Sequence, residues 1–291
     1  MTGPGVVDSH HHFWQLRRQS QPWRTNHHEA IARDFEPAEL AGQLRMAGVD
    51  ATVLVQSVDT PDENRELLAY AGAADFVAGV VGWLPLADPV AARRELDGWA
   101  PRDGWRGARC LIGRGETGWL TADGTLAVLN ELADRALCWD VVPVTGEQVD
   151  TVCAVADALP RLRIVVDHLA RPPLDTSSWQ PWAERLERLA SRPNVAVKVS
   201  VGIDALTGWR PWSADALVRY VRHALVSFGA GRLMLASNWP VVLLRRAYPE
   251  AWRDLRDAVT AAGAGPDELA AVAGGTATRW YRLGDDAAAR P

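Results

Sequence analysis

Short apolar runs alternate along this chain with longer segments in which apolar residues recur at helical spacing. The short runs are rich in valine and other residues that favour strands. We predict strands at 6–12, 51–56, 76–83, 105–111, 138–143, 162–168, 194–200 and 232–238. The pattern is that of βα units around a parallel sheet.

The helical spacing predicts helices at 37–47, 62–74, 89–99, 124–135, 146–159, 178–190, 213–228, 248–262 and 266–273. Ser178, Ser213 and Asp267 stand at the starts of three of them, where such residues cap helices. The segment 15–35, after the first strand, is too long for an ordinary connection. We expect it to form a lid or wall over a site.

Eight strand–helix units within 291 residues match the dimensions of a (β/α)₈ barrel. The predicted fold class is therefore α/β, a single TIM barrel domain over residues 1–291. A doubly wound open sheet is the alternative, but no Gly-x-Gly-x-x-Gly turn follows the first strand. No composition break or Ser/Gly linker divides the chain.

Composition and charge limit the kinds of molecule with which this protein is expected to interact. The 31 basic and 36 acidic residues give a net charge of −5, so we expect no nucleic acid partner. The longest apolar runs are far below the ~20 residues that span a bilayer, so we expect no membrane segment. The amino terminus has no basic start or cleavage pattern, and a cytoplasmic location is the expectation.

Histidines gather where the first predicted strand ends. Alternation along a strand puts His10 and His12 on one face and His11 on the other. Two neutral imidazoles one pleat apart can share one zinc or related ion, at ~2.0–2.1 Å from each nitrogen. The alternative is a polar strand end or the remnant of a cloning tag, although the three histidines lie inside a strand pattern.

The sixth predicted strand ends in Asp167 and His168. Alternation places His168 on one face with Ile164 and Val166. If that face lines the barrel, His168 joins His10 and His12 at the C-terminal rim, where barrel enzymes carry their sites. Asp167 is then expected to point toward the helices in a structural role.

Three other strand ends carry polar side chains. Lys198, the only lysine of the chain, is expected to point inward, where it contacts either substrate or a structural acid. Arg109 has the planar fork that binds a carboxylate or vicinal oxygens, unless it pairs with a surface helix. Asn238 places an amide at the same rim. Trp83 and Trp239 also lie beside this rim.

Taken together, these motifs resemble the amidohydrolase-2 branch of the amidohydrolase superfamily, and within it the sugar-lactone hydrolases. The resemblance covers nearly the whole chain and rests on stretches that occur in the same order: 8–14 (DSHHHFW), 22–23 (PW), 33–35 (RDF), 55–56 (VQ), 80–83 (VVGW), 166–172 (VDHLARP), 197–200 (VKVS) and 237–241 (SNWPV).

The resemblance implies a barrel hydrolase that opens the lactone of a sugar acid by water attack on the carboxylic ester. His10, His12 and His168 are the implied metal ligands, and His168 is also a candidate catalytic base. Members differ in whether they need a divalent metal, and zinc is the favoured ion. In this hypothesis Arg109, Lys198 and Gln56 hold the substrate, and Trp83 and Trp239 are further candidates for contact with it.

Asn238 departs from the family pattern, in which an aspartate at this position deprotonates the attacking water. A neutral amide cannot accept that proton, and general-base help is worth about 10²–10⁴ in rate. Asn238 therefore keeps two alternatives open: a lyase, such as a decarboxylase or hydratase, and a binding or inactive relative. The expected partner is a small-molecule lactone, and the sequence leaves a homo-oligomer open.

Overall fold

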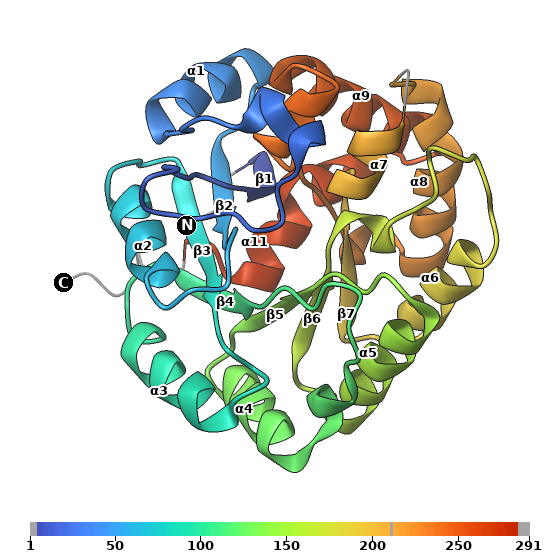
Figure 1. The fold of residues 1–291 in the computed structure, drawn as a ribbon. Coiled ribbons are helices and arrows are strands. Elements are labelled where there is room, and N and C mark those ends of the chain that lie inside the picture. The colour runs from blue at the N-terminus through green and yellow to red at the C-terminus, as the bar shows by residue number, and fades with distance from the viewer. Residues whose placement is uncertain (1–4, 210–211, 285–291) are drawn as a thin grey trace.

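The computed structural model describes residues 5–209 and 212–284. Eight parallel strands follow one another around a barrel in the order β1 to β8 (Figure 1). Their bounds are β1 Val7–His11, β2 Ala51–Val55, β3 Val77–Trp83, β4 Trp105–Arg109, β5 Cys138–Val141, β6 Arg163–Val166, β7 Val195–Val199 and β8 Leu233–Leu235. The predicted (β/α)₈ barrel is confirmed, and each predicted strand contains an observed one.

Helices surround the barrel, as the periodicity of the sequence predicts (Figure 1). They are α1 Pro37–Ala47, α2 Glu63–Gly72, α3 Pro89–Trp99, α4 Asp123–Asp134, α5 Gly146–Ala158, α6 Trp182–Ala190, α7 Ile203–Gly208, α8 Ala214–Phe228, α9 Tyr248–Ala261, α10 Pro266–Ala270 and α11 Thr276–Tyr281. The sequence did not predict α7 or α11. None of the helices in 5–209 and 212–284 is long and apolar enough to cross a bilayer.

The barrel closes between β8 and β1 through polar contacts beyond the regular ladder. The carboxylate of Asp8 accepts hydrogen bonds from the backbone nitrogen and hydroxyl of Ser237, at 2.8 and 2.6 Å, and one from the hydroxyl of Tyr248 at 3.1 Å. His12 donates its backbone N–H to Trp239 O at 2.7 Å. Asp8 thus joins the first strand, the last strand and α9.

Two apolar layers hold the fold together. The larger layer lies between strands and helices, and the smaller fills the barrel interior with small and β-branched side chains. Trp280 and Tyr281 of α11 belong to the interior cluster, and α11 is the red helix at the centre of Figure 1. The C-terminal helix therefore packs against the inner face of the strands, whereas α1 to α6, α8 and α9 cover the outer face (Figure 1).

The long segment between β1 and α1 crosses in front of the barrel, on the same side as α7 (Figure 1). Trp23 donates its indole N–H to Ser57 O at 2.9 Å, and His28 Nε2 lies 3.0 Å from Thr207 Oγ1 on α7. Both Trp23 and His28 line the cavity described below. The segment 15–35 therefore supplies a wall of the site, as its length predicts.

Candidate active site at the barrel mouth

A cavity of about 660 Å³ lies where the strands end. Of the residues expected in the site, His12, Arg109, His168 and Asn238 line it. These side chains are at most 6% exposed as residues, so water reaches them only through the cavity. The predicted rim therefore forms a pocket, and these polar groups come from β4 and the segments that follow β1, β6 and β8.

His10 of β1 and His12, the residue that follows the strand, converge on one point. His10 Nε2 and His12 Nε2 lie 3.1 Å apart, and their rings are nearly perpendicular at 87°. His12 Nδ1 lies 2.8 Å from Val55 O; because a carbonyl only accepts, Nδ1 carries the proton and Nε2 presents a lone pair. Burial lowers the pKa of His12 to about 3, so its ring is neutral.

The convergence of His10 and His12 depends on an irregularity in β1. Val7 belongs to the barrel interior, and simple alternation from it would turn His11 inward. The register between β1 and β2 shifts between Asp8 and His11, as in a β-bulge. After the shift His11 faces outward, with its Nε2 2.8 Å from Thr52 Oγ1, and His10 faces the mouth.

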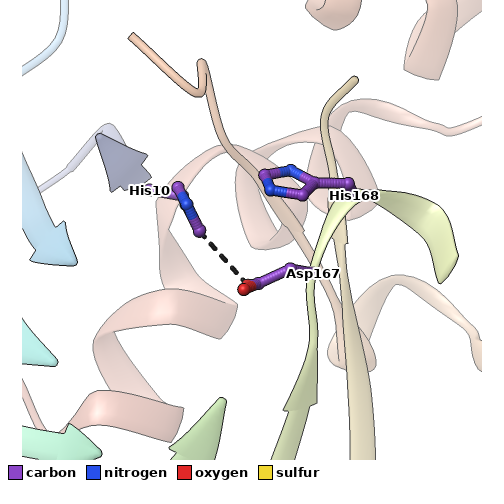
Figure 2. Close-up of side chains that lie close together, drawn as sticks. All are labelled: His10, Asp167 and His168. Carbon is purple, nitrogen blue, oxygen red and sulfur yellow. Dashed lines mark hydrogen bonds and ion pairs between the residues drawn. The ribbon is translucent and has the colours of Figure 1, made fainter. Parts of the chain in front are cut away.

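The donor set fits a zinc ion. Two ligands of a tetrahedral zinc at ~2.0–2.1 Å are ~3.3 Å apart, close to the 3.1 Å between the two Nε2 atoms. His10, Asp167 and His168 also offer ligand atoms that all lie within 4.8 Å of one another (Figure 2). Burial lowers the pKa of His168 to about 3 and that of His10 well below its usual value, so both rings are neutral.

Asp167 points into the barrel, and the prediction that it points toward the helices is wrong. Its carboxylate contacts His10 Nδ1 at 3.2 Å, as Figure 2 shows, and also Arg109 Nη1 at 2.8 Å. Val165 shares this inward face, whereas Ile164 and Val166 pack in the outer layer. Burial alone would raise the pKa of Asp167, but Lys198, His10 and Arg109 hold it well below its usual value.

His168 reaches the mouth although it does not share a face with Val166. Residues 168–171 all have left-handed backbone angles, with φ between 51° and 56°. Such angles cost non-glycine residues about 1–3 kcal/mol each and cluster at functional sites. The left-handed turn brings the ring of His168 to 4.7 Å from that of His10, and its Nδ1 lies 2.8 Å from Ser200 Oγ.

Arg109 lines the cavity and is held in place by two neighbours. It donates Nε–H to Gln56 Oε1 at 2.7 Å and also bonds Gln56 O and Asp167. Three of its five N–H groups are thereby used, which leaves two for a ligand. Gln56, expected to touch substrate, does not line the cavity and instead orients this arginine.

Lys198 points inward as predicted, but it does not line the cavity. Its ammonium is fully buried, 2.6 Å from Asp140 Oδ2, 3.0 Å from Asp167 Oδ1 and 3.1 Å from His10 Nδ1. Tyr281 of α11 donates its hydroxyl to the same oxygen of Asp140 at 2.7 Å. Of the two alternatives open for Lys198, the structure shows the ion pair with acids.

The two tryptophans expected at the rim do not line the cavity either. Trp239 is 1% exposed and packs edge-on against Phe13 and Phe35, with ring centroids 5.8 and 5.3 Å away. Trp83 is buried in the outer layer and bonds Asn64 through its backbone. Both residues therefore have packing roles in the described structure and do not reach the cavity.

Asn238 does line the cavity. Its side-chain nitrogen donates to Val201 O at 2.9 Å, which leaves the amide oxygen as the acceptor that it offers to the cavity. Its backbone is left-handed, with φ 57°, and its backbone N–H donates to His10 O at 2.9 Å. Asn238 is therefore fixed through its side chain to the segment that follows β7, and through its backbone to β1.

Sequence reasoning missed Asp140 and Arg171. Asp140 lies inside a short apolar strand, where an acid is the signal of a buried partner. Arg171 lines the cavity three residues after His168, within the left-handed turn. Neither alternation nor helical spacing describes that turn, so the pattern of the sequence gave no indication of where Arg171 points.

Comparisons with known proteins agree with this geometry. Residues 7–283 match the amidohydrolase family. An L-fucono-1,5-lactonase of Burkholderia ambifaria is 34% identical, with 95% of each chain covered, and one of Burkholderia multivorans is 31% identical, with 98% of each chain covered. An amidohydrolase of Burkholderia multivorans with bound zinc has a TM-score of 0.86 at 28% identity, covering 96% of this chain and 99% of its own.

Proposed function

The chain belongs to the amidohydrolase family, and from that membership we propose that it hydrolyses the carboxylic ester of a sugar-acid lactone. The observation that carries the proposal is the convergence of the His10 and His12 Nε2 atoms, 3.1 Å apart, beside a cavity that also exposes His168 and Arg109. The names of the two curated relatives support a lactone as the substrate. The predicted preference for zinc is supported by the zinc-bound relative.

In this proposal His10, His12 and His168 hold a divalent ion. The ligand atoms that lie within 4.8 Å of one another are those of His10, Asp167 and His168, so Asp167 is an alternative to His12 as a ligand. A bound ion of this kind polarises a carbonyl and lowers the pKa of water. The residues around it have separate tasks. Asp167 orients His10 through Nδ1, and Val55 O fixes the tautomer of His12.

Arg109 is suited to hold the lactone. Its two remaining N–H groups are available to the carbonyl or ring oxygen, and Gln56 and Asp167 prevent the guanidinium from turning away. As the ester opens, negative charge develops on oxygen, and a fixed cation beside it stabilises that charge. Metal binding and proton transfer are alternative roles for His168. Where His10 and His12 alone hold the ion, the neutral ring of His168 accepts the proton from water, and Asn238 offers its amide oxygen to the same water.

Asn238 supports a second candidate, a lyase. An amide in place of a carboxylate leaves no general base at this position to activate water. A decarboxylation does not need such a base. An inactive binding relative is the third outcome. The three are separated by turnover measured on two kinds of substrate.

The test uses purified protein with L-fucono-1,5-lactone and other aldonolactones, acid release being followed with a pH indicator. We expect hydrolysis above background, lost after chelation and restored by zinc. His12→Ala should abolish it, while His223→Ala, on the outer helix α8, should not. Asn238→Asp should raise the rate by up to about 10²-fold if the missing base limits turnover.

Absence of hydrolysis in both the original chain and Asn238→Asp, with carbon dioxide released from carboxylated substrates, would favour the lyase. Ligand binding without turnover of either kind would leave the binding relative.

A further inference from the structure

The cavity continues outward from the buried reaction centre to a charged rim. Arg114, Arg171 and Asp204 line this part, with side chains 71%, 24% and 51% exposed. His168 and Arg109, at the inner end, are 5% and 3% exposed. Side-chain exposure therefore rises from the inner end of the cavity to its rim. The ester of a substrate would lie at the buried inner end, and any second group would lie at the exposed rim.

The rim carries an excess of positive charge. At the inner end the charge of Arg109 is balanced by Asp167, 2.8 Å away. At the rim Arg171 and Arg114 share the single carboxylate of Asp204, through a contact with Arg171 Nη1 and one of 3.5 Å with Arg114 Nη2. Two other acids lie near the cavity without lining it: Asp175 lines an adjoining pocket of about 220 Å³, and Asp59 accepts from Leu111 N at 3.1 Å. One positive charge therefore faces the cavity without a matching acid among its described lining residues.

Arg171 also has a donor without an acceptor. Its Nε is buried and has no hydrogen-bond partner among the described residues. A buried N–H without a partner is unfavourable, and such groups in native proteins call for a ligand or water. The side chain is aimed by the left-handed turn at 168–171. The turn is closed by bonds between residues three apart, among them Arg171 N–H to His168 O at 2.8 Å, so Arg171 lies on the same side as His168.

The cavity is larger than a six-carbon lactone needs. Such a lactone has ~12 heavy atoms, and even at the ~30 Å³ that each molecule occupies in liquid water they fill only ~360 Å³. About half of the 660 Å³ then remains, toward the rim. A substrate that fills the cavity extends from the imidazoles to Arg171.

We propose that Arg171 is a specificity-determining residue that binds a carboxylate on the substrate, and that the preferred substrates are lactones bearing a free carboxylate remote from the ring ester. The proposal rests on the proposed lactone hydrolysis and adds a substrate class to it. A guanidinium presents Nε and Nη donors in a plane that matches the two oxygens of a carboxylate. Asp204 holds Nη1, which leaves Nε and the Nη2 donors of Arg171 for such a carboxylate.

The test compares two substrates that differ only at this remote group. D-Glucaro-1,4-lactone and D-glucono-1,4-lactone share a ring, and one carries a carboxylate where the other carries CH₂OH. We expect a kcat/KM at least ten times higher for the glucarolactone. Arg171→Gln should lower that ratio by about 10- to 100-fold, while Arg161→Gln, before β6 at the far end of the barrel, should leave it unchanged.

Asp204→Asn supplies an effect of opposite sign. Removing the acid that shares Arg171 should raise the preference for the glucarolactone severalfold. If the Arg171 and Asp204 pair were merely structural, both variants would lower kcat/KM for the two lactones equally, and the proposal would be wrong. A preference of the original chain for the neutral lactone would also overturn it.

A binding measurement separates this proposal from the proposed function. Trp23 lines the cavity, so quenching of tryptophan fluorescence reports binding without turnover. Binding of glucarolactone that weakens in Arg171→Gln, without hydrolysis of any lactone, would refute the lactonase but support carboxylate recognition. Hydrolysis of both lactones with equal efficiency would support the lactonase and refute carboxylate recognition.

Discussion

The buried lysine makes the most demanding prediction about stability. Lys198 lies at 0% exposure with Asp140 and Asp167 within 3.0 Å, and Arg109 balances the second acid. Two cations and two anions are therefore enclosed together. Lys198→Met leaves one uncompensated negative charge in the barrel interior. Breaking a buried pair in this way costs about 3–5 kcal/mol, and we expect that loss in the free energy of unfolding.

A double-mutant cycle tests whether charge balance is the cause. Asp140→Asn alone leaves an excess cation, whereas Lys198→Met combined with Asp140→Asn restores neutrality. The double variant should therefore be more stable than the sum of the two single losses predicts, by at least ~1 kcal/mol. Urea unfolding followed by circular dichroism and tryptophan fluorescence gives the four free energies, with coincident transitions as the check on two-state behaviour.

The control is Arg161→Met, which removes an exposed ion pair with Asp134. Its side chain is 68% exposed, and such pairs are worth at most ~1 kcal/mol. If Lys198→Met costs no more than this control, the buried charges do not stabilise the barrel. If the single losses simply add, Lys198 and Asp140 are not coupled, and the argument from charge balance fails.

Three further predictions concern packing, closure and metal. Gly82→Ala should destabilise the fold by at least ~2 kcal/mol, because a Cβ there overlaps the indole of the neighbouring tryptophan on β4. Gly72→Ala, with open space around its Cβ, should instead stabilise α2 by up to ~1 kcal/mol. Thermal unfolding of the two variants checks both expectations. Tyr248→Phe should cost about 1–2 kcal/mol in urea unfolding, because Asp8 loses a buried donor, and no change would contradict this role in closure. His10→Ala should weaken zinc affinity, measured by chelator competition, by more than the ~10–100-fold typical of residues outside the coordination sphere; an unchanged affinity would exclude His10 as a ligand.

The barrel itself could be predicted because each of its strands is a short apolar run between segments of helical period. The inward direction of Lys198 followed from the valines on either side of it, which pack in the outer layer at Val197 and Val199. The partner of Lys198 could not be predicted, because Asp140 is far away in sequence and shares no local pattern with the lysine. Helix α11 was missed for a related reason: it is short and packs inside the barrel, where no amphipathic stripe is needed.

Four of the predicted rim residues line the cavity, but strict alternation, which was used to place them, fails at the ends of two strands. Alternation assumes extended backbone, but His168 has a left-handed φ angle, and a register shift interrupts β1 before His11. Each departure turns toward the cavity a side chain that strict alternation would direct away from it. The conformational cost is offset by packing elsewhere. Local rules break where the chemistry is held, so the residues that alternation misplaces are themselves candidates for the site. By that reasoning Arg171, in the same left-handed turn as His168, belongs with the functional residues and not with the surface charges.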